Sequence, residues 1–97
     1  MSTTRGDGFV MEGAEVPPID FTAFLLGLAS AALIHLGAAP HPETGAVAVD
    51  LAEARRSLDL LGLLREKTRG NLTAEEERLF GNLLGDLRLR YVEASRT

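Results

Sequence analysis

Apolar residues recur at intervals of three and four residues in the second half of the chain, with charged residues between them. This spacing puts apolar side chains on one face of a helix and predicts two amphipathic helices, at 51–69 and 74–94. Asp50 and Thr73 stand at the N-cap positions, each with a glutamate three residues later, as in a capping box. The predicted buried stripes are Ala54, Leu58, Leu61 and Leu64 in the first helix, and Leu79, Phe80, Leu83, Leu84, Leu87 and Tyr91 in the second.

The connection between these two helices is short, because Gly70 follows the first and Thr73 already caps the second. A turn of this length joins antiparallel helices. Gly70 stands where a helix commonly ends in a left-handed residue, which glycine adopts without steric penalty. The sequence therefore predicts a helical hairpin with Gly70 at the C′ position.

A third helix is predicted at 21–37, capped by Asp20, and it has a different pattern. One face carries Phe21, Phe24, Leu25, Leu28, Ala32 and Leu36, and the other carries Leu26, Leu33 and Ile34 among small residues. A helix that is apolar all round is buried, either in protein or in lipid.

Membrane insertion of this helix is the alternative, because residues 21–39 carry no charge and approach the roughly 20 residues that cross a bilayer. However, no Lys or Arg follows before Arg55, and neither end of the segment carries Trp or Tyr. Both the positive-inside signal and the aromatic belt are therefore missing. Burial in protein is favoured, with a membrane anchor at 21–39 as the second interpretation.

A single hairpin covers only one side of the apolar helix, so the other side needs a partner. Self-association, most simply as a two-fold dimer, provides one. Glycines inside the last helix cost roughly 1 kcal/mol each relative to alanine, which close packing against a neighbour would explain. The prediction is an all-α homo-oligomer of three-helix subunits, with an interface formed by Leu26, Ser30, Leu33, Ile34, Gly81, Gly85, Leu89 and Val92.

The first 18 residues lack periodicity and are predicted to form a flexible tail, followed by one helical domain at 19–97. Phe9, Val10 and Met11 are the apolar interruption in this tail. The first residues also lack the apolar stretch of a secretory signal, which favours a cytoplasmic protein.

Composition excludes several kinds of chemistry. Without cysteine there is no disulfide and no thiolate nucleophile or ligand, and a net charge of -4 disfavours nucleic acid. His35 and His41 lack the spacing and the third ligand of a zinc site. No serine stands in a pattern that suggests a nucleophile with its base. We therefore expect no catalytic residue, cofactor or metal, and favour a protein-interaction or accessory module that binds itself and an unidentified protein partner.

Three stretches of the chain resemble a family of short bacterial proteins classed as a domain of unknown function. They are ALIHLG at 32–37, EKTRGNLT at 66–73 and LRLRYVE at 87–93. The resemblance covers roughly residues 20–94 and implies a bacterial, cytoplasmic protein. It implies no activity, and no functional residue is carried over from it.

Overall fold

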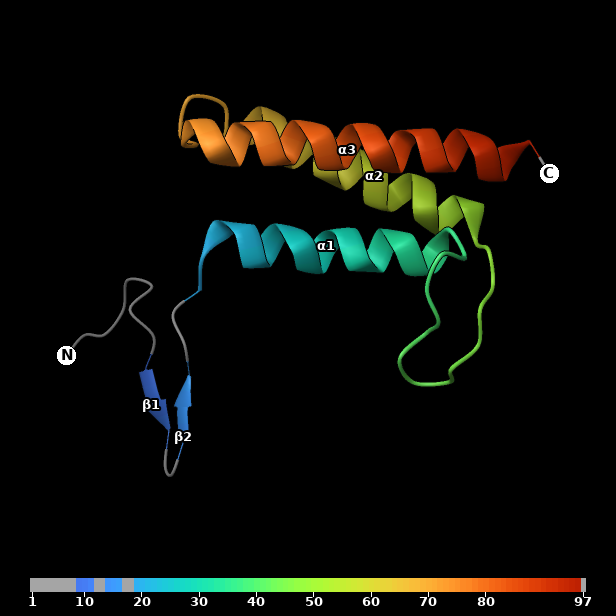
Figure 1. Cartoon of the computed structure of the whole chain (residues 1–97), viewed down its shortest axis with the longest axis horizontal. Coiled ribbons are helices and arrows are strands. Elements are labelled where there is room, and N and C mark those ends of the chain that lie inside the picture. The colour runs from blue at the N-terminus through green and yellow to red at the C-terminus, as the bar shows by residue number, and fades with distance from the viewer. Residues whose placement is uncertain (1–8, 12–13, 17–18, 97) are drawn as a thin grey trace.

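The computed structural model describes residues 9–11, 14–16 and 19–96. Within them the chain forms three helices, α1 (Phe21–His35), α2 (Leu51–Lys67) and α3 (Ala74–Ser95), and two strands, β1 (Phe9–Met11) and β2 (Ala14–Val16). Helices α2 and α3 form an antiparallel hairpin, and α1 lies along one side of it (Figure 1). The predicted three-helix fold is confirmed.

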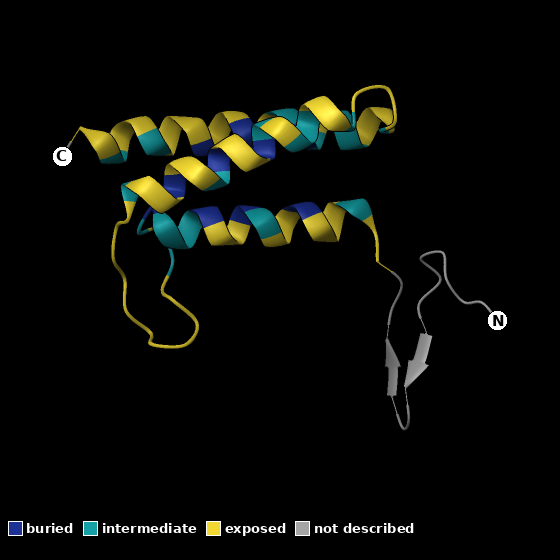
Figure 2. Ribbon diagram, turned by 180° about the vertical axis from the view of Figure 1, so that it is seen from behind, coloured by how far each residue is buried: buried dark blue, intermediate teal, exposed yellow. Residues whose placement is uncertain are grey.

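The core lies where the three helices meet, and buried residues line the facing sides of the ribbons (Figure 2). Each helix contributes a stripe at helical spacing: Leu25, Ala29, Ala32 and Leu36 from the α1 segment, Ala54, Leu58 and Leu61 from α2, and Phe80, Leu84 and Leu87 from α3. Leu64, Leu79, Leu83 and Tyr91 are partly buried against this core. The stripes predicted for the hairpin are confirmed.

The predicted buried face of α1 is wrong at one position. Phe24 is 48% exposed, and Ala29 is buried in its place. Successive residues are turned by about 100°, so a face centred on Leu25 and Ala32 leaves Phe24 at its edge. The Phe24 ring instead packs on Phe21, with the ring centroids 6.3 Å apart.

Side-chain caps start each helix as the sequence predicts. The carboxylate of Asp20 accepts a hydrogen bond from the Ala23 N–H at 2.8 Å. At α3 the capping box is complete, because Thr73 Oγ1 accepts from the Glu76 N–H at 3.1 Å and Glu76 Oε1 accepts from the Thr73 N–H at 2.8 Å.

The box predicted at Asp50 forms only in half. Asp50 Oδ1 accepts from the Glu53 N–H at 3.1 Å, but the Asp50 N–H donates to the carbonyl of His35 at 2.7 Å. That donor is therefore used by α1 and is not free for the Glu53 side chain. This bond places the start of α2 beside the end of α1.

Helix α1 ends at His35, two residues before the predicted end, because Gly37 has a φ of 76°. The Gly37 N–H donates to the Ile34 carbonyl at 3.0 Å and the Ala38 N–H to the Leu33 carbonyl at 2.9 Å, as in a Schellman motif. Among the described helices, none is long and apolar enough to cross a bilayer.

Gly70 has a φ of 85°, so the predicted left-handed residue is confirmed. Its predicted place in the helix end is wrong, because α2 is capped by Thr68 and Gly70 comes two residues later. The Asn71 N–H donates to the Thr68 carbonyl at 2.9 Å and closes a four-residue turn. Gly70 is the third residue of that turn, a position that favours glycine.

The sequence did not predict strands in the segment that precedes α1. β1 pairs with β2 in antiparallel register, with Phe9 opposite Val16. Three residues are too few for an alternating pattern to stand out from chance, which explains the omission. The described residues of this hairpin contact no helix. The rest of the predicted tail, at 1–8, 12–13 and 17–18, lies outside the described residues, and its flexibility stays a prediction.

Candidate interaction surface

The exposed side of α1 carries no charged residue. Phe24 and Leu26 are 48% and 46% exposed on it, and the other exposed residues of this helix are Thr22, Ala23, Gly27, Ser30 and Ala31. Figure 2 shows these exposed positions along the side of α1 that faces away from the hairpin. Helix surfaces in contact with water normally carry charged and strongly polar side chains, so this face has the character of an interface.

No described residue requires a glycine at position 27. A Cβ built on Gly27 would meet no atom of the described residues within 4 Å. Glycine in a helix interior costs roughly 1 kcal/mol relative to alanine, and the single subunit gains nothing visible in return. Together with Ala23, Ser30 and Ala31, Gly27 leaves this part of α1 without bulky side chains, which allows another helix to approach closely.

Two of the predicted interface residues on α1 also serve the subunit itself. Leu33 is partly buried against the core, and Ile34 is partly buried beside the connector between α1 and α2. Leu26 and Ser30 remain exposed. Whether any of the four contacts a partner stays a prediction.

The predicted residues on α3 lie on a different surface from those on α1. Leu89 and Val92 are 57% and 44% exposed, and Val92 lies on the flank of α3 next to α2. Gly85 is exposed beside them, and a Cβ at this position would meet no described atom within 4 Å. Gly81 differs, because its Cβ would lie 3.0 Å from the guanidinium of Arg65 in the same chain. Within one subunit, the eight predicted residues therefore do not lie on one surface.

Val92 borders a groove between α2 and α3, together with Tyr91 and an ion pair. Arg55 Nε donates to Asp59 Oδ1 at 3.2 Å. This hydrogen bond, with a smaller contribution from Tyr91, raises the pKa of the Arg55 guanidinium above its usual value. The Arg55–Asp59 ion pair makes one rim of the groove polar.

The fold brings the two histidines to one small pocket, although they are separated in sequence. His35, His41 and Asp50 line a cavity of about 290 Å³ beside the connector. His41 Nδ1 accepts a hydrogen bond from the Glu43 N–H at 3.2 Å, so one nitrogen is already used. Within the described residues, no three His, Asp or Glu side chains are grouped so that they could hold a metal ion.

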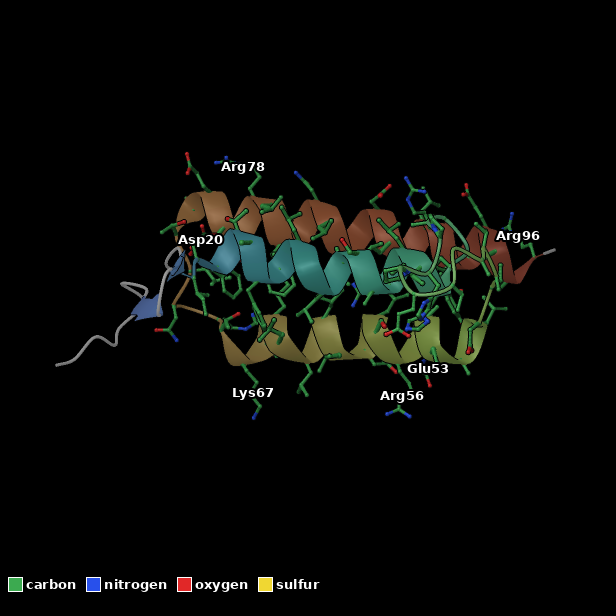
Figure 3. The ribbon with its side chains drawn as sticks, turned by 90° about the horizontal axis from the view of Figure 1, so that it is seen from below. Asp20, Glu53, Arg56, Lys67, Arg78 and Arg96 are labelled. Carbon is green, nitrogen blue, oxygen red and sulfur yellow. The ribbon has the colours of Figure 1, made fainter. Side chains whose placement is uncertain are left out.

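Two leucines on α2 are exposed to solvent and were not predicted from the sequence as a surface feature. Leu60 and Leu63 are 51% and 54% exposed, and with Arg56 they border a shallow groove on the outer side of α2. Figure 3 shows the labelled Arg56 and Lys67 pointing away from the bundle on this side. The spacing of positions 56, 60, 63 and 67 places all four on one face, a signal that was readable in the sequence.

Comparison with known proteins gives a family but no activity. No curated protein and no solved structure matches the chain. A family model described as a domain of unknown function, DUF1844, matches residues 18–93. The matched segment includes α1, α2, the turn at Gly70 and all but the last two residues of α3, and it begins after the β-hairpin. The chain belongs to this family of unknown function.

Proposed function

We propose that this protein is a homodimeric interaction module without catalytic activity, and that the exposed side of α1 is its dimer interface. The observation that carries the proposal is the uncharged exposed side of a helix in a chain of which 25% is charged. Surrounding that side with water leaves Phe24 and Leu26, at its two edges, half exposed, whereas a second subunit packed along it would shield them from water.

A second copy of the chain suits this surface better than a charged partner does. In a two-fold interface, residues near the axis face their own copies, so a charge there would repel itself. The α1 face has no such charge. Its small residues around Gly27 also allow two copies of α1 to approach closely.

The proposal leaves other surfaces free for a different protein. Leu60 and Leu63 on α2, and Leu89 and Val92 on α3, are exposed apolar side chains outside the α1 face. We assign them to an unidentified protein partner, for which the dimer would present each surface twice. We also place the protein in the bacterial cytoplasm, as the resemblance in its sequence implies.

The test compares two leucine-to-glutamate variants by light scattering after size exclusion. The native chain is expected at twice its mass of 10.4 kDa. Leu26→Glu puts a charge on the α1 face and should give a folded monomer. Leu63→Glu is the matched control, because this leucine is similarly exposed on α2, at 54% against 46% for Leu26, and it should remain a dimer.

Circular dichroism of both variants checks that each is still folded. A native chain that runs as a monomer at micromolar concentration contradicts the proposal. So does a Leu63→Glu variant that dissociates while Leu26→Glu does not, because the interface would then lie on α2.

A further inference from the structure

Two arginines reach across the hairpin and lie over glycines of the opposite helix. A Cβ built on Gly81 of α3 would lie 3.0 Å from Nη2 of Arg65, which belongs to α2. In the same way, a Cβ on Gly62 of α2 would lie 3.3 Å from Nη2 of Arg88, which belongs to α3. Each glycine lowers the helix propensity of its position relative to alanine. The two glycines thus make room for guanidinium groups close to the backbone.

These side chains border a groove of about 310 Å³, and all the residues that line it belong to α2, α3 or the residues that follow α2. Gly62 and Leu84 are its uncharged residues. The charged residues that line it are Arg65, Glu66, Arg69, Glu77 and Arg88. Three guanidiniums and two carboxylates leave one positive charge in excess, although the whole chain has a net charge of -4.

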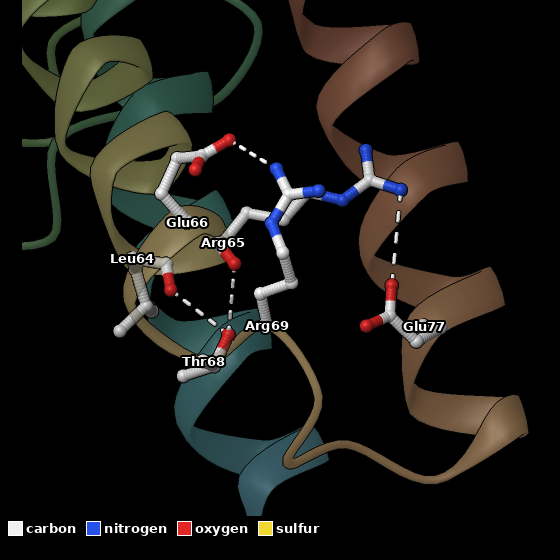
Figure 4. Close-up of polar contacts among 6 residues, drawn as sticks. All are labelled: Leu64, Arg65, Glu66, Thr68, Arg69 and Glu77. Carbon is white, nitrogen blue, oxygen red and sulfur yellow. Dashed lines mark hydrogen bonds and ion pairs between the residues drawn. The ribbon is translucent and has the colours of Figure 1, made fainter.

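The two carboxylates of the groove do not neutralise all three of its arginines. Figure 4 shows Arg69 paired with Glu66 and Arg65 reaching Glu77 across the hairpin. The Arg65–Glu77 pair is long, at 3.9 Å, and its side chains are 42% and 40% exposed, so it contributes little to stability. Arg88 forms no ion pair with any described residue.

Arg65 is also held in place by an aromatic ring of the core. Its guanidinium lies 6.0 Å from the centre of the Phe80 ring, at the distance of a cation–π contact, and Phe80 is fully buried. An arginine that is already oriented loses less entropy when it binds a ligand. The groove is thus partly organised before any ligand enters.

We propose that this groove binds the phosphate group of a small phosphorylated molecule, held by Arg65, Arg69 and Arg88. Guanidinium groups match the geometry of phosphate oxygens and pair with them through two hydrogen bonds. A phosphate monoester carries between about -1.5 and -2 charges and three terminal oxygens, one for each arginine. A carboxylate offers one charge and two oxygens, and so it matches the three arginines less well. The cavity volume leaves room for more of the molecule than its phosphate.

Binding is tested with inorganic phosphate and with phenyl phosphate as probes, at constant ionic strength. Calorimetry gives the dissociation constant, and the amide resonances of Gly62 and Gly81 report the location by NMR. Arg88→Gln should raise the dissociation constant roughly tenfold, because it removes a charge-assisted contact. Arg56→Gln is the matched control, because it removes the same charge from the outer side of α2, and it should change the constant less than about twofold.

Gly62→Ala separates an effect on phosphate binding from an effect on stability. The added methyl group displaces only the end of the Arg88 side chain, so the helix should become more stable. Phosphate binding should nevertheless weaken, because the guanidinium must shift by a few tenths of an ångström from its position over Gly62. A variant that is more stable yet binds phosphate less well supports the proposal.

Other outcomes contradict the inference. Failure of both probes to bind saturably contradicts it, as does equal loss of binding in Arg56→Gln and Arg88→Gln. Acetate that competes as well as phosphate would make the site a carboxylate site. Vesicles containing phosphatidic acid distinguish a lipid headgroup, and binding to them without binding to the free phosphates overturns the proposal. The groove has no residue from α1, so these results are independent of the dimer proposed above.

Discussion

The turn between α2 and α3 depends on one residue with an unusual backbone conformation. Gly70 has a φ of 85°, and a Cβ built there would meet no atom within 4 Å. A substitution therefore tests the backbone alone, without any clash. Gly70→Ala should lower the free energy of unfolding by about 1 kcal/mol, because a left-handed residue with a Cβ is penalised. Urea denaturation measures the loss.

Two further variants at the same turn sharpen this prediction. Gly70→Asn should cost less than Gly70→Ala, because asparagine tolerates positive φ better than most residues. Asn71→Ala, at the next and exposed position, is the control and should change stability by less than about 0.5 kcal/mol. An alanine variant at Gly70 as stable as the native chain would show that the turn adopts another conformation in solution.

Gly37 combines a positive φ with a close contact, and the two effects can be separated. Its φ is 76°, and a built Cβ would lie 2.7 Å from Cγ2 of Val49. Gly37→Ala should therefore cost more than Gly70→Ala, where only the backbone is strained. Val49 is 57% exposed, so Val49→Ala alone should cost little.

A double-mutant cycle measures how much of the cost is the contact with Val49. In the Val49→Ala background, Gly37→Ala should lose only the backbone penalty, and its cost should fall to that of Gly70→Ala. If the costs of Gly37→Ala and Val49→Ala simply add in the double variant, the connector at Gly37 moves away from Val49 freely, and the contact contributes nothing to stability.

At the scale of the helices, the two glutamates at capping positions have different roles. Glu76 accepts from the Thr73 N–H at 2.8 Å, whereas the Asp50 N–H opposite Glu53 is bound to the His35 carbonyl. Glu76→Ala should therefore cost more than Glu53→Ala. Both variants remove a negative charge from the first turn of a helix, so the dipole contribution largely cancels in the comparison.

Unfolding by urea gives both free energies, and a difference on the order of 0.5 to 1 kcal/mol is expected for one hydrogen bond. Glu76→Gln is the control that keeps an oxygen able to accept from Thr73, and it should recover most of the loss. Equal costs for Glu53→Ala and Glu76→Ala would show that the capping hydrogen bond at α3 adds nothing to stability.

The hairpin could be predicted from the sequence because α2 and α3 each have a polar side that fixes which residues turn inward. Helix α1 has no charged side, so its periodicity is compatible with several orientations, and the exposure of Phe24 followed only from packing. Contacts between distant residues were also out of reach. The bond from Asp50 to His35, which removes one capping partner, depends on how the connector folds back, and so does the pocket that both histidines line.

The two candidate surfaces also differ in whether they could be predicted from the sequence. The uncharged side of α1 was readable residue by residue. The groove between α2 and α3 was not, because Arg65 and Arg88 meet Gly81 and Gly62 only when the two helices pair in their observed register. The glycines at 81 and 85 were attributed to one helix contact, whereas the structure gives Gly81 an arginine neighbour and leaves Gly85 open.

For the molecule as a whole, the β-hairpin is expected to be dispensable for folding. Its described residues contact no helix, and an isolated two-stranded hairpin is only marginally stable. Removing residues 1–16 should leave the helical circular dichroism signal and the melting temperature nearly unchanged. A large fall in either would show that the segment before α1 docks on the bundle.

Dimerisation through α1 would also couple folding to protein concentration. If the folded subunits associate and unfolded chains do not, mass action stabilises the dimer as the concentration rises. Each tenfold increase adds about 1.4 kcal/mol per dimer. The melting temperature of the native chain should therefore rise by several degrees over about a hundredfold range of concentration.

The surface variants decide whether α1 is responsible for that coupling. Leu26→Glu places a charge beside its own copy in the proposed interface, so its melting temperature should be lower and independent of concentration. Leu63→Glu carries the same change on α2 and should keep the concentration dependence of the native chain. A native melting temperature that does not change with concentration would mean that the uncharged side of α1 is exposed to water in the folded protein.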